Sequence, residues 1–226
     1  MFSVRTEPFG PLNEIRLINT QTGESASIIP GFGAALNSLV LRKGTSLYDI
    51  VEGSDNYEDL ISHGVKFCKG LVLFPFPNRI KDGKYNFEGK TYELDLSEPD
   101  RNNAIHGFAM QAPFTIVRTE ADADKAEIEL SYEELGSTKG YPFKTKLTVV
   151  YTLTPISGLI CKCFIQNTDN QKIPVGLGWH PYFKTGSKVD TLELTIPATK
   201  VFDVDNRLIP TGKYLDNPFA GKRVLT

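Results

Sequence analysis

Polar and apolar residues alternate with a period of two along most of this chain, which is the pattern of β-strands with one buried face. No segment has convincing helical periodicity. The polar stretch 47–69 is expected to form a long loop with at most a short helix. Strands are predicted at 14–18, 27–29, 35–41, 71–74, 114–117, 126–132, 143–154, 158–167 and 192–196.

The pairing of these strands is expected to be antiparallel. From Lys144 to Thr148 every second residue is polar, and the alternation in the run 144–151 indicates a sheet with one solvated face. Tyr85 to Leu94 alternates around Glu88-Gly89, a two-residue turn signal typical of a hairpin. Sandwiches of this length are commonly single domains, so residues 1–226 are predicted to form one all-β domain.

The stretch 176–183, GLGWHPYF, is the strongest candidate for a functional site. As a strand it would direct Val175, Leu177 and Trp179 to the core, and Gly176, Gly178, His180 and Tyr182 to the other face. Two glycines beside a histidine can leave room for a ligand, and Pro181 is expected to end the strand. A histidine packed in an aromatic cluster is the alternative.

Two further stretches carry candidate chemistry. Asn78 and Arg79 follow the buried run 71–74, and the planar guanidinium of Arg79 suits hydroxyl pairs, although a structural ion pair is an equal alternative. His106 lies next to Gly107, beyond the turn-prone run 98–102, and a loop histidine of this kind can point into a cleft. His63 has no partner at metal-ligand spacing, so it is interpreted as a surface residue.

Composition excludes several classes of protein. The chain of 226 residues is 40% apolar, 23% charged and has a formal net charge of -2, so it carries no basic footprint for nucleic acid. It has no apolar run of membrane-spanning length and no signal-peptide core, so a cytoplasmic location and no membrane partner are expected. Cys161 and Cys163 could be half of a metal site but are interpreted as reduced packing residues. A zinc site formed by the three histidines is disfavoured because none of them has close spacing.

The motifs Pro77-Asn78-Arg79-Ile80, Ile105-His106-Gly107-Phe108 and Gly178 to Phe183 occur in this order. With them the chain resembles the aldose 1-epimerases, the galactose mutarotase family, over essentially its whole length. The resemblance implies a large antiparallel β-sandwich, the supersandwich, with a sugar cleft. It also implies that His180 is the general acid that protonates the ring oxygen of a hexose, and that Arg79 and His106 hold the sugar.

The substrate is then a small sugar, whose α and β anomers interconvert by ring opening and closure, and no cofactor or metal is required. Imidazole suits this acid role because it titrates near neutral pH. His180 and His106 are therefore the predicted catalytic residues. Arg79, Asn78, Trp179 and Tyr182 are the predicted substrate-binding residues.

The chain departs from the family pattern near its end. The family's general base is a glutamate in a late strand, and the sequence reaches Thr226 without a counterpart. The chain is therefore expected to be truncated, lacking the last strands, and to self-associate through exposed edges. The alternatives are a hexose-6-phosphate 1-epimerase, which Met110 in the place of an expected arginine disfavours, and a non-catalytic carbohydrate-binding protein.

Overall fold

The fold was obtained as a computed structural model, which describes residues 1–219 and 223–224; Thr226 lies outside them. The chain divides into two compact units. The first unit comprises Met1–Asn78 and His106–Phe183, and the second comprises Arg79–Ile105 and Lys184–Thr226.

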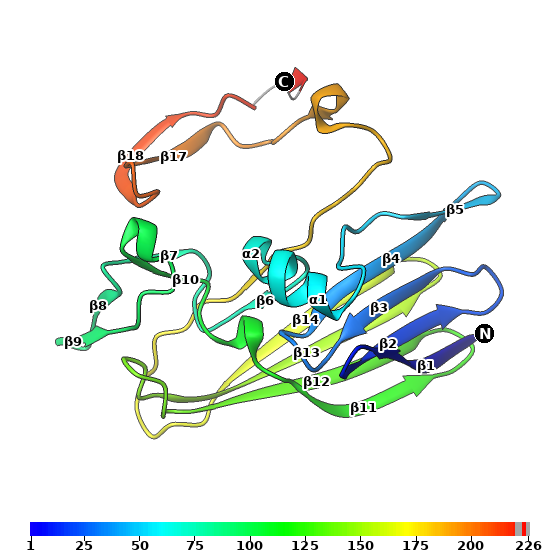
Figure 1. Cartoon of the computed structure of the whole chain (residues 1–226), viewed down its shortest axis with the longest axis horizontal. Helices are drawn as coiled ribbons and strands as arrows, with labels where there is room; N and C mark the ends of the chain where they lie inside the picture. The colour runs from blue at the N-terminus through cyan, green and yellow to red at the C-terminus, as the bar shows by residue number, and fades with distance from the viewer. Residues whose placement is uncertain (220–222, 225–226) are drawn as a thin grey trace. The chain divides into compact units, whose positions relative to one another are not determined.

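The first unit is built mainly from two antiparallel sheets of four and five strands (Figure 1). One is a meander in the order β1-β2-β3-β4-β5, formed by β1 (Phe2–Phe9), β2 (Leu12–Asn19), β3 (Ser25–Ile29), β4 (Ala35–Lys43) and β5 (Ser46–Asp49). The other has the order β11-β12-β13-β14, formed by β11 (Thr115–Ala121), β12 (Ala126–Leu135), β13 (Lys144–Thr154) and β14 (Gly158–Asn167).

The core of the first unit lies between these sheets. Leu17, Ile28 and Leu36 of the first sheet share one buried cluster with Ile128 and Val149 of the second. In β13 the side chains that alternate with polar ones are buried, as the pattern predicted. The fold is therefore an all-β sandwich, which confirms the predicted fold class.

The stretch 47–69 contains more structure than a loop. After β5, a helical segment runs through α1 (Tyr57–Asp59), the π-helical turn η1 (Leu60–Gly64) and α2 (Val65–Phe67). The Asn56 side chain caps its start by accepting from the Asp59 N–H at 2.9 Å, and Cys68 ends it in a left-handed conformation. Short β6 (Val72–Leu73) and β15 (Gly178–Trp179) pair with each other, and η3 (Ala109–Gln111) precedes β11.

The second unit consists of short strands. The predicted hairpin forms between β8 (Lys84–Phe87) and β9 (Lys90–Glu93), with positive φ at both Glu88 and Gly89. The other described elements are β7 (Arg79–Lys81) paired with β10 (Asn103–Ile105), η2 (Pro99–Arg101), η4 (Val189–Thr191), β16 (Glu193–Leu194) paired with β19 (Arg223–Val224), and β17 (Lys200–Val204) paired with β18 (Pro210–Asp216).

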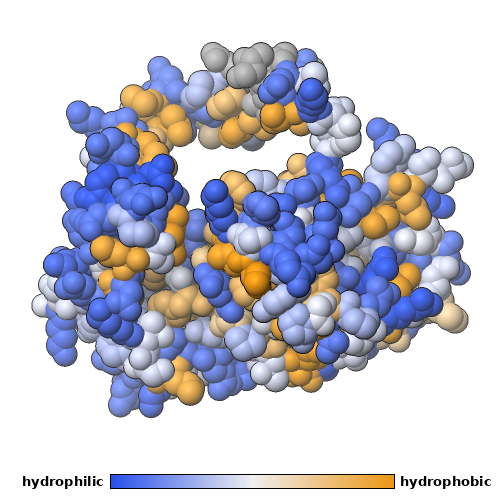
Figure 2. All heavy atoms as spheres, in the orientation of Figure 1, coloured by the Kyte–Doolittle hydropathy of each residue, from blue (hydrophilic) through white to orange (hydrophobic). Residues whose placement is uncertain are grey.

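Several apolar side chains remain at the surface. The rings of Phe202 and Tyr214 contact each other across the β17–β18 hairpin and are exposed, and Figure 2 shows apolar surface on this hairpin. In the first unit β14 is an edge strand among the described residues, with Phe164 exposed. Self-association through such edges, and the single domain, stay predictions.

Candidate active site

The segment 176–183 is attached to the first unit by its backbone. Gly178 pairs with Leu73 and Trp179 with Val72. The N–H of His180 donates to the Leu71 carbonyl at 3.1 Å, and its own carbonyl accepts from the Gly70 N–H at 3.0 Å. These two hydrogen bonds fix the main chain of His180. The regular strand ends at Trp179, two residues before Pro181.

The two glycines leave space for a neighbouring proline. A Cβ on Gly176 would lie 2.9 Å from Cδ of Pro77, and one on Gly178 would lie 2.8 Å from Cβ of Pro77. These distances are shorter than carbon atoms tolerate, so only glycine fits against the proline ring. The prediction that the glycines clear a floor for a ligand is therefore wrong: Pro77 fills that space.

The predicted core face of this segment is also wrong. Val175 is 42% exposed, and Leu177 and Trp179 are each 36% exposed. The segment pairs for only two residues, and it is the glycine side that packs on Pro77 and Leu73. Alternation gives the two faces of a strand but does not say which of them meets the protein.

His106 is held by Asn78 through two reciprocal hydrogen bonds. The backbone N–H of Asn78 donates to Nδ1 of His106 at 3.0 Å, and the backbone N–H of His106 donates to the Asn78 carbonyl at 3.0 Å. Both residues have positive φ, 63° for Asn78 and 64° for His106. Left-handed backbone at non-glycine residues costs free energy and often occurs at functional sites.

The two predicted catalytic histidines lie together. The ring centroids of His106 and His180 are 5.7 Å apart, and the ring planes meet at 74°. The ring centroid of Tyr182 lies 5.3 Å from that of His180. Among the residues that the structure describes, none forms a hydrogen bond with the buried Nδ1 of His180. A buried nitrogen of this kind calls for a functional explanation. No bond at Nδ1 fixes the tautomer of His180, so the ring can hold its proton on either nitrogen.

Arg79 lies in the second unit and forms an ion pair there. Its Nε and Nη2 donate to the two carboxylate oxygens of Glu98, each at 2.8 Å. These bonds lower the pKa of Glu98 to about 2 from its ordinary value of 4.5 and raise the pKa of Arg79. The structure therefore shows the ion pair that was the alternative interpretation of Arg79, and sugar binding by this side chain stays a prediction.

The two predicted aromatic ligands of the sugar are partly exposed. Trp179 donates from Nε1 to the Gly70 carbonyl at 3.2 Å, and its ring centroid lies 6.1 Å from that of the buried Tyr151. Tyr182 is 37% exposed, and its carbonyl accepts from the N–H of Glu52. Both rings therefore have surface left for a ligand.

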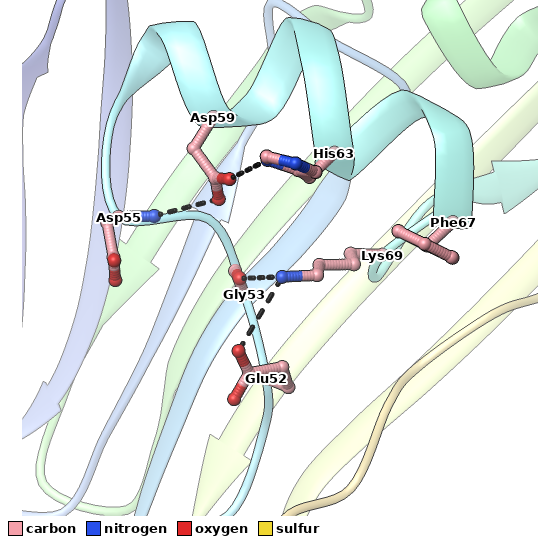
Figure 3. A pocket seen from close by; sticks show the side chains of 7 residues that line it. All are labelled: Glu52, Gly53, Asp55, Asp59, His63, Phe67 and Lys69. Atoms are coloured by element: carbon pink, nitrogen blue, oxygen red, sulfur yellow. Dashed lines mark hydrogen bonds and ion pairs between the residues drawn. The ribbon is translucent and has the colours of Figure 1, made fainter.

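A separate hollow of about 290 Å³ lies beside the helical segment 57–67 (Figure 3). His63 bonds Asp59 through Nδ1 at 3.0 Å, and Lys69 lies 3.5 Å from Glu52 and donates to the Gly53 carbonyl. His63 is exposed, as predicted. The sequence analysis missed this hollow because the four-residue spacing of Asp59 and His63 has meaning only on a helix, and the stretch 47–69 was expected to be mainly a loop with at most a short helix at no stated position.

The remaining candidates for metal ligands pack in the core. Cys161 and Cys163 are partly buried and contact the main hydrophobic cluster, which confirms their interpretation as packing residues. A hydrogen bond with Cys163, and then burial, raise the pKa of Cys161. Within residues 1–219 and 223–224, no three acidic, cysteine or histidine side chains gather as a metal site would require.

A family model described as aldose 1-epimerase matches residues 15–223, nearly the whole chain. The chain belongs to the aldose 1-epimerase family. It is 34% identical over 143 residues to uncharacterized protein YihR of Escherichia coli (strain K12), which covers 63% of this chain and 45% of that protein. It is 28% identical over 223 residues to galactose mutarotase of Bos taurus, which covers 94% of this chain and 62% of that enzyme.

Solved structures of epimerase relatives have the same fold. A galactose mutarotase-like protein from Clostridium acetobutylicum superposes with a TM-score of 0.82 at 26% identity, over 95% of this chain and 65% of that one. Galactose 1-epimerase from Lactobacillus acidophilus superposes with a TM-score of 0.80 at 19% identity, over 99% of this chain and 67% of that one. The chain thus spans about half to two thirds of the length of the curated relatives described above. Among the described residues no helix has the length and apolar character needed to cross a membrane.

Proposed function

We propose that this member of the family is an aldose 1-epimerase that interconverts the α and β anomers of free hexoses, with His180 as general acid. The observation that supports the proposal is the His106–His180 pair, with ring centroids 5.7 Å apart and the His180 main chain bonded on both sides. Two imidazoles at this distance can both reach one small polar ligand.

The reaction transfers two protons and removes no group. His180 gives a proton to the ring oxygen while a base takes the proton of the C1 hydroxyl, the bond between C1 and the ring oxygen breaks, and an aldehyde forms. Rotation about the bond between C1 and C2 exposes the other face of the aldehyde. The same steps in reverse then close the ring as the other anomer. His106 binds an oxygen of the sugar, and the exposed faces of Trp179 and Tyr182 provide aromatic surface for its C–H groups.

Polarimetry tests this proposal directly. Freshly dissolved α-D-glucose or α-D-galactose should reach its equilibrium rotation faster with the protein than without it, and His180→Asn should remove the acceleration. Calorimetry on the same sample separates the alternatives, because sugar binding without acceleration identifies a carbohydrate-binding protein. Turnover of glucose 6-phosphate in preference to glucose would identify a hexose-phosphate epimerase. Met110 disfavours that result, because its buried side chain packs with Leu71 and Leu73.

A further inference from the structure

The turns at Asn78 and His106 are joined by two hydrogen bonds, and the donor in each is a backbone N–H. Each residue donates its backbone N–H to the other, one to a ring nitrogen and one to a carbonyl, both at 3.0 Å. The two residues are 28 positions apart in the sequence. The His106 ring therefore takes its orientation from the backbone of a distant segment as well as from its own side-chain rotamer.

The backbone conformation at Asn78 is what directs its N–H at the ring. Its φ of 63° lies in the left-handed region, which asparagine tolerates better than most residues and β-branched residues tolerate poorly. On the other side, His106 and Gly107 have φ of 64° and 70°. A Cβ at Gly107 would lie 2.2 Å from the Phe74 carbonyl oxygen, so the backbone of this turn packs directly against Phe74 and only glycine fits there.

The bond from Asn78 determines which nitrogen of His106 carries a proton. Nδ1 accepts a hydrogen bond, so the proton of the neutral ring is on Nε2. His106 then presents Nε2–H to a ligand as a donor. His180 differs from it, because no group in the described part of the chain bonds its buried Nδ1 and fixes a tautomer.

We propose that Asn78 is a positioning residue, which acts through its left-handed backbone by fixing His106 as the Nε2–H tautomer. One consequence of the inference rests on the proposed epimerase function. In that reaction His106 donates a hydrogen bond to a sugar oxygen and leaves proton transfer to His180. It assigns to the backbone of Asn78 a role that the side chain alone does not perform.

Two substitutions at this position separate backbone from side chain. Asn78→Gly and Asn78→Val both remove the carboxamide, but glycine adopts a positive φ readily and valine does not. Nitrogen-15 NMR of the histidine rings gives the tautomer in each variant. His63 is the internal comparison, because its Nδ1 bonds the Asp59 carboxylate and so carries a proton.

The expected result is that Asn78→Gly keeps His106 in the Nε2–H form, while Asn78→Val shows a mixture of tautomers. A left-handed backbone conformation costs about 1–2 kcal/mol at a valine and little at a glycine. We therefore expect kcat/KM of Asn78→Val to be about tenfold lower than that of Asn78→Gly. Circular dichroism of both variants establishes that they are folded. If valine prevents folding, Asn78→Ala replaces it, with the same direction of effect.

Equal kcat/KM and an unchanged His106 tautomer in both variants would overturn the inference, because the side chain alone would then explain any loss. A wild-type His106 with its proton on Nδ1 would overturn it as well. If the wild-type protein does not accelerate anomer exchange, the proposed function fails. The NMR comparison of the two variants still decides the inference in that case, since it needs no turnover.

Discussion

Arg79 and Glu98 form a bidentate ion pair, in which Nε donates to Oε2 and Nη2 donates to Oε1, both at 2.8 Å. Glu98 also accepts from Asn103 at 3.0 Å and from Arg101 at 3.1 Å. Its side chain therefore joins β7, η2 and β10 within the second unit. A carboxylate with four donors around it is much more stable ionised than protonated.

Glu98→Gln is expected to destabilise the protein by about 1–3 kcal/mol at pH 7, because it removes the charge from these hydrogen bonds. The pKa of Glu98 is about 2 in the folded protein, below its ordinary value of 4.5. The contribution of the carboxylate is therefore present above pH 4.5 and is lost as the pH falls toward 2. Urea unfolding of the variant and the wild type at several pH values should show the difference in unfolding free energy shrinking across this range.

Glu93→Gln is the matched control in the same unit. The Glu93 carboxylate is exposed and lies 3.6 Å from Nζ of Lys84. An exposed pair of this kind contributes less than about 1 kcal/mol, so the control should change stability little. Equal losses in the two variants would show that the environment of Glu98 has no special importance.

Gly178→Ala is expected to destabilise the first unit by about 1–3 kcal/mol, as overpacking usually does. The added Cβ would lie 2.8 Å from Cβ of Pro77 and 3.4 Å from Cδ1 of Leu73, and the proline ring cannot rotate away. Thermal unfolding measures the loss, with the exposed Ser157→Ala as control. A variant as stable as the wild type would show that the segment before His180 shifts without cost.

Tyr151→Phe tests how the two sheets of the sandwich are joined. The fully buried hydroxyl of Tyr151 donates to the carbonyl of Ala34 at 3.1 Å, which links β13 to the residue that precedes β4. Without the hydroxyl a buried carbonyl loses this partner, which costs about 1–3 kcal/mol. Tyr48→Phe, at an exposed position, should be neutral in the same chemical denaturation. Equal losses of unfolding free energy in both variants would show that the Tyr151–Ala34 hydrogen bond does not stabilise the sandwich.

Strands such as β2 were predictable because their burial follows the period of two. In β13, Leu147, Val149 and Tyr151 occupy alternate positions and are fully buried, as the pattern indicates. The first strand, β1, was missed, as was the β17–β18 hairpin. The residues of β18 are all exposed, so its sequence carries no burial pattern to follow.

The candidate site was predictable only in part. His106 and His180 were named from the sequence, and the structure brings their rings together. The role of Gly176 and Gly178 depends on Pro77, a residue about 100 positions away, and alternation contains no information about such a contact. The alternation pattern also contains no information about the ion pair of Glu98 with Arg79, which forms through the fold of the second unit.

The sharpest prediction for the proposed chemistry concerns His180. His180→Asn should reduce the rate of anomer exchange about 10²- to 10⁴-fold, because asparagine cannot donate a proton as an acid, while the fold remains intact. His63→Asn is the matched control, since His63 is an exposed histidine bonded to Asp59 on the helical segment. Polarimetry measures the rate, and circular dichroism confirms folding. Unchanged exchange in His180→Asn would assign the acid to another residue, whereas equal losses in both variants would trace the effect to the loss of any histidine.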